Sequence, residues 1–308
     1  MISSYQLLCV LLLSRIAAEL TFPVAGGYDA TTLAAAALAE LIRFAAALPV
    51  LLYSIKGSSF YAAITRKSRI GGWFIGLAAA LVVAIFAVNS AIFTAEFAQR
   101  TVLSGMSGAV SALLIAAFAI YAAVKGAEAI ARSSVLILAG AAVITVISVI
   151  AATPHMRELT ISPEIGTDFL SQVYGRLSRG SEYLIFSALL PHIKRDKNAL
   201  SPAGSVVAFC GISMACVLLI QLFGMAVLGE FYALAEYPFT AAAQLSDIAL
   251  FKRLDGFTAA VWAAAGAMRC AVYLYAVYSI IAAVKNTVKG DKHEADTHRR
   301  NTGGNAAA

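Results

Sequence analysis

Long runs of hydrophobic residues, separated by short polar segments, recur along the whole chain. A helix that crosses about 30 Å of hydrocarbon needs roughly 20 mainly apolar residues, and windows of this kind occur from one end to the other. They cover residues 4–22, 31–55, 72–97, 107–124, 133–152, 168–192, 203–228 and 256–284. The pattern predicts an all-α, polytopic helical membrane protein with about eight spans.

The sixth window, 168–192, differs from the others because glycines and polar residues interrupt it. Gly175, Arg176, Ser178, Arg179 and Gly180 stand near its centre. Irregular backbone at membrane depth must be buried in protein or lie next to water, so we interpret the window as two half-helices around an irregular centre. The alternative is an outer loop over 153–180 followed by a short apolar run over 182–193, which is brief for a full crossing.

The Lys and Arg residues of the short connections indicate the cytoplasmic side. If the N-terminus is inside, the inner connections hold 14 of the 23 Lys and Arg residues and the outer connections hold four. We therefore expect both termini to be cytoplasmic. Residues 1–288 are predicted to form the transmembrane helical domain. Residues 289–308 are charged and nearly devoid of large apolar side chains, which is typical of a disordered tail.

The composition of the chain excludes several classes of protein. The chain is 60% hydrophobic and 13% charged, with a mean hydropathy of +0.81, which excludes an ordinary soluble domain. The net charge of +6 resides in short clusters without a continuous basic face, so the bilayer is the expected partner and nucleic acid is not. The four cysteines lie inside apolar stretches and are interpreted as packing residues. Phosphate-binding, nucleophile and zinc motifs are missing from the sequence, so we expect no enzyme activity, cofactor or metal site.

Charged residues inside the spans are the informative ones, because each is costly in lipid unless it is paired or faces a wet cavity. Arg15 and Glu19 are four residues apart on the first span, share a helix face and can neutralise each other. Either they form a structural ion pair, or they line a cavity where Pro23 and the glycines after it weaken the helix. Glu40 and Arg43, three apart on the second span, are expected to pair.

Further candidates lie on the sixth, third and eighth spans. Ser181 and Glu182 begin a new apolar half-helix whose amides, with nearby guanidinium groups, favour a carboxylate. Asn89 and Ser90 either face the same cavity or hydrogen-bond a neighbouring helix. Arg269 needs a partner such as Glu19 or Glu182. The candidate ligand-binding residues are Arg15, Glu19, Asn89, Ser90, Ser178, Gly180, Ser181, Glu182 and Arg269.

Three stretches together resemble the spore germination permease family, the B subunits of germinant receptors, within the amino acid/polyamine/organocation transporter superfamily. They are residues 2–8 with 13–16, the KGAEAIAR segment at 125–132, and Tyr237-Pro238 followed by FKRLD at 251–255, Trp262 and YLY at 273–275. Their order and separations agree along the chain. The resemblance implies a 5+5 inverted-repeat transporter fold, with the ligand between broken spans 1 and 6 and with the third and eighth spans beside them.

The sequence departs from this family pattern in two places. Ala17 and Ala18 follow the Ser-Arg-Ile of the first span, where family members usually carry glycine. The final hairpin of the second repeat has no counterpart among the eight windows. We therefore expect a truncated form of the fold.

The leading hypothesis is a non-enzymatic germinant-receptor subunit that binds a small germinant, an amino acid, and signals spore germination. The resemblance implies a location in the spore inner membrane and two partners, an A-type membrane subunit and a C-type lipoprotein. The alternative is a secondary amino acid transporter driven by ions or protons. A third possibility is a scaffold without a pocket that only anchors its partners.

Overall fold

The computed structural model describes residues 2–23, 26–54, 60–103, 105–159, 161, 165–180, 182–194, 201–245 and 254–303. Within these residues the regular structure is helical, apart from one isolated bridge between Ile2 and Ile193. The α-helices are α1 (Ser4–Thr21), α2 (Ala30–Ser54), α3 (Phe60–Lys67), α4 (Arg69–Thr101), α5 (Gly108–Lys125), α6 (Ala127–Ala152), α7 (Phe169–Leu177), α8 (Glu182–Leu189), α9 (Pro202–Leu228), α10 (Pro238–Gln244) and α11 (Leu254–Gly303). Short 3₁₀ turns follow three of them: η1 (Thr153–His155), η2 (Leu190–His192) and η3 (Gly229–Ala233). The predicted all-α fold is confirmed.

Seven of the described helices are long and apolar enough to cross a membrane, namely α1, α2, α4, α5, α6, α9 and α11. They correspond to seven of the eight hydrophobic windows. The sixth window instead contains α7 and α8, of nine and eight residues, which are separated around Gly180. This arrangement agrees with the interpretation as two half-helices. That the pair completes an eighth crossing stays a prediction.

Serine residues cap the N-terminal ends of α1, α4, α5 and α9. Ser3 and Gln6 form a capping box at the start of α1, which satisfies backbone donors that have no partner within the helix. Ser68, Ser107 and Ser201 cap α4, α5 and α9 in the simpler way, each accepting from a backbone N–H three residues later. The chain therefore marks the boundaries of its apolar runs with residues that end or begin helices.

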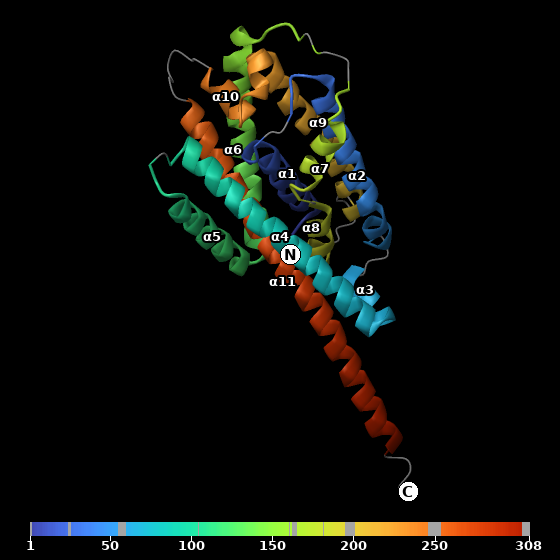
Figure 1. The fold of residues 1–308 in the computed structure, drawn as a ribbon. Helices are drawn as coiled ribbons and strands as arrows, with labels where there is room; N and C mark the ends of the chain where they lie inside the picture. The colour runs from blue at the N-terminus through green and yellow to red at the C-terminus, as the bar shows by residue number, and fades with distance from the viewer. Residues whose placement is uncertain are drawn as a thin grey trace.

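The first helix lies at the centre of the bundle. Its apolar window is 78% buried, against 11% for α5, and it packs on α6, α8, α9 and α11. Figure 1 shows α1 enclosed by the longer helices. Most of its side chains, polar as well as apolar, are buried, so α1 is the element on which the others assemble.

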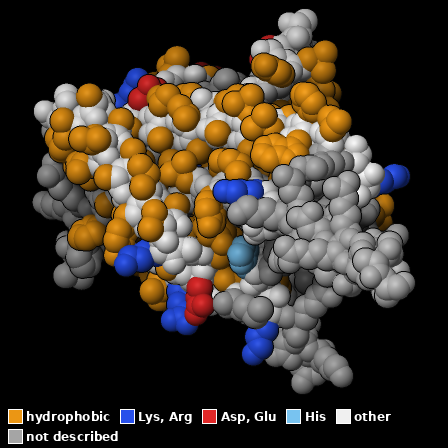
Figure 2. All heavy atoms as spheres, turned by 90° about the horizontal axis from the view of Figure 1, so that it is seen from below, with side chains coloured by type: hydrophobic (Ala, Val, Ile, Leu, Met, Phe, Trp, Pro, Cys, Tyr) orange, Lys and Arg blue, Asp and Glu red, His pale blue; other side chains and the backbone are white. Residues whose placement is uncertain are grey.

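Large hydrophobic side chains cover the outside of the bundle. On α4 alone, Ile70, Phe74, Leu77 and Leu81 are each at least 60% exposed. Figure 2 shows hydrophobic side chains spread over much of the visible face, with few charged ones among them. Apolar patches of this extent mark a membrane or protein contact, and together with seven span-length helices they identify an integral membrane protein.

The break that the resemblance implies for the first span is not found in α1. The helix runs without interruption from Ser4 to Thr21, because Ala17 and Ala18 have high helix propensity where glycine would weaken it. The helix ends at Thr21, two residues before Pro23. Phe22, the residue before this proline, is extended at φ −95° and ψ 140°, since a following proline disfavours the helical conformation.

The start of the chain is joined to the end of the broken span. The Ile2 N–H donates to the His192 carbonyl at 3.0 Å, and the Lys194 N–H donates to the Ile2 carbonyl at 2.9 Å. The C-terminal helix α11 leaves the bundle as one long rod (Figure 1) and continues as helix to Gly303, beyond the predicted domain boundary. Disorder of residues 289–308 stays a prediction.

Candidate functional site

Eight charged side chains are buried together around the break between α7 and α8. None of them is more than 5% exposed. We name them the charge cluster, and its members are Arg15 and Glu19 of α1, Glu40 and Arg43 of α2, Arg176 of α7, Arg179, Glu182 of α8 and Arg269 of α11. Since buried charges are stable only when paired, their mutual contacts decide how this site is built.

Glu19 is surrounded by cationic donors. Its carboxylate accepts from Arg176 at 2.9 Å, from Arg15 at 3.2 Å and from Arg179 at 3.4 Å. Gln221 of α9 adds an amide donor at 2.8 Å. The predicted pairing of Arg15 with Glu19 is confirmed, and three helices now converge on one carboxylate.

Glu40 joins α2 to α1. It accepts from Arg15 Nε at 2.7 Å and from Arg43. The pairing of Glu40 with Arg43 was predicted from their spacing and is confirmed. Arg15 therefore bridges two carboxylates on different helices, which makes it the central cation of the cluster.

Glu182 is the first residue of α8 and faces α11. Its carboxylate lies 3.5 Å from Arg269 Nη2, 3.5 Å from the Tyr273 hydroxyl and 3.4 Å from the Ser14 hydroxyl. Of the two partners expected for Arg269, Glu182 is the one that it contacts. These contacts are longer than those of Glu19, so Glu182 is the most weakly held carboxylate of the cluster.

Arginines donate to backbone carbonyls around the break in the sixth span. Arg43 donates to the Arg176 carbonyl, and Arg269 donates to the Arg179 carbonyl. Arg179 itself donates to the Pro23 carbonyl at 3.1 Å, just beyond the end of α1. Because unsatisfied carbonyls are costly inside a membrane, these guanidinium groups stabilise the irregular backbone while they bind the carboxylates.

Gly180 makes the close approach at the break possible. Its φ of +126° lies in a region that residues with a Cβ rarely adopt. A Cβ at this position would be 2.6 Å from Arg269 Nη2 and would also collide with the Tyr273 hydroxyl.

We expect Gly180→Ala to destabilise the protein by about 1–3 kcal/mol, since it combines a strained backbone with displacement of Arg269. Thermal unfolding of the purified protein in detergent measures this. Gly175→Ala is the matched control, because Gly175 lies within α7 and an added Cβ there meets nothing within 4 Å. Alanine should be neutral or stabilising at that helical position. Equal melting temperatures for the two variants would contradict the role assigned to Gly180.

The cluster carries more positive than negative charge. It contains five arginines and three glutamates, so with every group ionised two positive charges have no counter-charge among the described buried residues. Guanidinium nitrogens of Arg43, Arg176 and Arg269 are buried without a hydrogen-bond partner in the described part of the chain, as is the Gln221 side-chain oxygen. Guanidinium groups with free donors bind carboxylates well, and the free amide oxygen can accept from an ammonium group.

The cavity next to these groups is small. Glu19, Gln221, Tyr232 and Tyr237 help to line a space of about 10 Å³, which is room for about one water molecule. The arginine side chains contact the glutamates directly, and the space beside Glu19 is much smaller than the polar cavity expected midway through the bundle. A larger ligand can enter only if the surrounding helices separate.

The structure brings together most, but not all, of the residues predicted for this site. Arg15, Glu19, Gly180, Glu182 and Arg269 all take part in the contacts described above. Ser178 does not, because its side chain is exposed and donates to the Gly175 carbonyl at 2.8 Å. Its neighbour in sequence, Arg179, is the one that turns inward.

The remaining predicted residues lie apart from these contacts. Asn89 of α4 is half-buried and makes no hydrogen bond with a described residue. Ser90 is fully buried, and its hydroxyl has no partner in the described part of the chain. Ser181 lies outside the described residues.

The candidate list left out six members of the site. Glu40 and Arg43 were expected only to pair with each other. Arg176 and Arg179 were noted as polar residues near the break but were not named as candidates. Gln221 binds Glu19 and Tyr273 contacts Glu182, yet neither was a candidate. A signal existed for each, because Gln221 is an amide inside an apolar window and Tyr273 lies four residues after Arg269, on the same helix face.

A family model described as "Spore germination protein" matches residues 41–289. The matched range includes Arg43, Arg176, Arg179, Glu182 and Arg269 of the charge cluster. No match is found among curated proteins.

Proposed function

The chain belongs to the spore germination protein family, and we propose that it is a membrane-embedded germinant-receptor subunit that binds an amino acid and passes the signal on. The observation that carries this proposal is the charge cluster, with its two excess positive charges and its unpartnered guanidinium nitrogens. A free amino acid supplies a carboxylate for these groups. Its ammonium group matches Glu182, whose present contacts are the longest.

Signalling would follow from the small size of the space beside Glu19. About 10 Å³ does not hold an amino acid, so binding requires the helices around the cluster to move apart. A ligand that binds only the open arrangement shifts the population towards it. The half-helices α7 and α8 are suited to this movement, because the backbone between them is already irregular.

The proposal includes a place in the cell and partner proteins. Both termini would be cytoplasmic, and the membrane would be the spore inner membrane. The open state would be passed to an A-type membrane subunit and a C-type lipoprotein. No catalytic step takes part in this scheme.

Binding by the purified wild-type protein tests the proposal directly. A panel of amino acids is titrated, and each ligand found is compared with its methyl ester and with the analogue that lacks the amino group. The ester should bind about 10- to 150-fold more weakly, since hydrogen bonds to charged groups contribute about 1.5–3 kcal/mol. If no amino acid binds, or if the ester binds as tightly as the free acid, the proposed site is wrong.

A substitution at Glu182 tests where the ammonium group of the ligand binds. Glu182→Gln should weaken affinity for the amino acid by a similar factor while leaving affinity for the analogue without the amino group almost unchanged, because the analogue has no ammonium to pair. Glu230→Gln is the matched control, since Glu230 is exposed in η3, away from the cluster. Loss of affinity for both ligands in the first variant would place the ammonium elsewhere.

A secondary amino acid transporter is the second candidate, and the two half-helices that meet at the cluster favour it. Broken helices at the centre of a bundle are where many transporters bind substrate and coupling ion. Uptake into proteoliposomes separates the candidates. Concentrative uptake driven by an ion or proton gradient supports transport, whereas binding without flux supports the receptor.

A further inference from the structure

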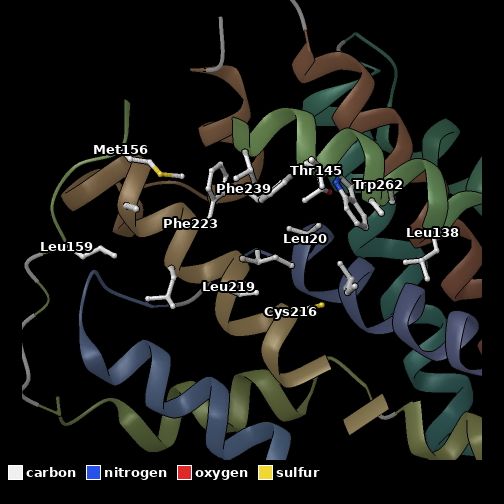
Figure 3. A pocket seen from close by; sticks show the side chains of 18 residues that line it. Leu20, Leu138, Thr145, Met156, Leu159, Cys216, Leu219, Phe223, Phe239 and Trp262 are labelled. Carbon is white, nitrogen blue, oxygen red and sulfur yellow. The ribbon is translucent and has the colours of Figure 1, made fainter. Parts of the chain in front are cut away.

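A second and much larger cavity lies beside the cluster. It has a volume of about 590 Å³ and lies between α1, α6, α9, α10 and α11, with the segment after α6 at one end (Figure 3). This volume falls within the usual range for small-molecule sites. Its lining comes mainly from α6 and α9 and includes Leu138, Ala142, Thr145, Met156, Phe239 and Trp262.

The lining is hydrocarbon except for two polar atoms. The Trp262 indole N–H and the Thr145 hydroxyl are both buried and have no hydrogen-bond partner in the described part of the chain. Trp262 is only 2% exposed, and both side chains lie on the cavity wall in Figure 3. Apart from these two side chains the lining is almost entirely apolar, so a ligand that fits this cavity is a long and mainly apolar molecule.

The length of the cavity matches one leaflet of a bilayer. On α6 the lining runs from Leu138 to Val149, and on α9 from Cys216 to Ala226. At about 1.5 Å per residue, these stretches are roughly 15–17 Å long, which is about half of the 30 Å hydrocarbon core. Met156 and Leu159, in the segment beyond the end of α6, line the other end. The cavity thus extends from a helix end to about the middle of the membrane.

A cation lies near the end of the cavity that Met156 and Leu159 line. Arg157 is exposed, and its backbone N–H donates to the carbonyl of Ala226 at 2.8 Å, which fixes the segment against a lining helix. Glu158, also exposed, follows it. Arg157 directly follows Met156, which lines this end of the cavity, and its guanidinium group is complementary to the phosphate of a lipid whose chain enters there.

We propose that this cavity binds one acyl chain of an anionic membrane phospholipid. Arg157 contacts the phosphate of the lipid, and the acyl chain extends past Thr145 and Trp262 towards Leu138. Leu20, Ile220 and Phe239 line both this cavity and the small space beside Glu19. A bound chain therefore supports α1 and α9 at the separation at which Gln221 reaches Glu19.

The sequence offers a direct probe, because it contains two tryptophans, Trp73 and Trp262. Trp73 is 44% exposed on α4, and Trp73→Phe leaves Trp262 as the single fluorophore. The variant is placed in nanodiscs of unlabelled phosphatidylcholine with increasing fractions of phosphatidylglycerol brominated on its acyl chains. Bromine quenches tryptophan only near contact. We expect strong quenching of Trp262 that saturates at a low fraction of brominated lipid.

Substitutions on one helix test the location. Ala142→Phe places a ring in the cavity and should abolish the saturable quenching. Ala139→Phe, on the exposed face of α6 outside the lining, should leave it intact. Arg157→Gln should remove the preference for brominated phosphatidylglycerol over brominated phosphatidylcholine and retain quenching by both.

Several outcomes would overturn the proposal. One is unquenched Trp262 emission, which means that water or protein fills the cavity. Others are quenching that rises in simple proportion to brominated lipid, and equal quenching in the Ala142→Phe and Ala139→Phe proteins. Each of these is read without an amino acid ligand, so the result is independent of the receptor test.

Discussion

Replacing Glu19 with glutamine is expected to reduce the free energy of unfolding by about 3–5 kcal/mol, the usual loss when one partner of a buried ion pair is removed. The side chain keeps its size, so the effect comes from charge. Arg15, Arg176 and Arg179 would lose their common counter-charge, and the excess of positive charge in the cluster would increase from two to three. Thermal unfolding in detergent, together with the yield of folded protein, measures the loss.

The matched control is an ion pair at the surface. Glu236 pairs with Arg100, and their side chains are 39% and 54% exposed. Glu236→Gln should cost no more than about 1 kcal/mol, since solvent screens such pairs. If both variants melt at the same temperature, Glu19 is not the centre of the cluster.

The second large effect is expected for Arg269→Leu. Arg269 joins α11 to the break through Glu182 and the Arg179 carbonyl, and its guanidinium carbon lies 5.1 Å from the ring centroid of Phe22. Leucine fills part of the volume but leaves a carboxylate and a carbonyl without their cation. We expect a loss of about 3 kcal/mol or more and faster amide hydrogen exchange in α7 and α8.

Two further variants separate charge from geometry. Arg269→Lys keeps the charge but cannot donate in several directions from one plane, so it should recover only part of the stability. Arg132→Leu removes an arginine from an exposed pair with Glu128 and should leave stability and exchange nearly unchanged. Exchange in α7 and α8 that does not differ between Arg269→Leu and Arg132→Leu would show that α11 does not hold the break in place.

Much of the fold could be predicted because a helix that spans lipid must be long, apolar and regular. Each spanning helix satisfies its own backbone, so length and hydropathy were enough to find the seven long helices. The broken span was predictable for the same reason. Gly175, Arg176 and Gly180 violate the requirement for a regular apolar helix and identify the broken span. Gly175 and Arg176 themselves lie within α7, and of the three Gly180 stands at the break.

The site was predictable only along single helices. Arg15 with Glu19, and Glu40 with Arg43, are fixed by helical spacing and were found. The contacts of Glu40 with Arg15 and of Glu19 with Arg176 join residues on different helices. They depend on how each helix is rotated and packed, which spacing does not specify. Ser178 and Arg179 illustrate the limit, since adjacent residues near a helix end point in very different directions.

The central position of α1 has a consequence for biosynthesis. Its window has the lowest mean hydropathy of the seven, 1.2, and it carries Arg15 and Glu19, whose partners Arg176, Arg179 and Gln221 occur much later in the chain. The translocon must release this poorly inserting segment before those partners have been synthesised. Final docking of α1 therefore waits until α7 and α9 have been synthesised, and a chain stalled before α7 would leave Glu19 without Arg176 and Arg179 and become a target for membrane proteases.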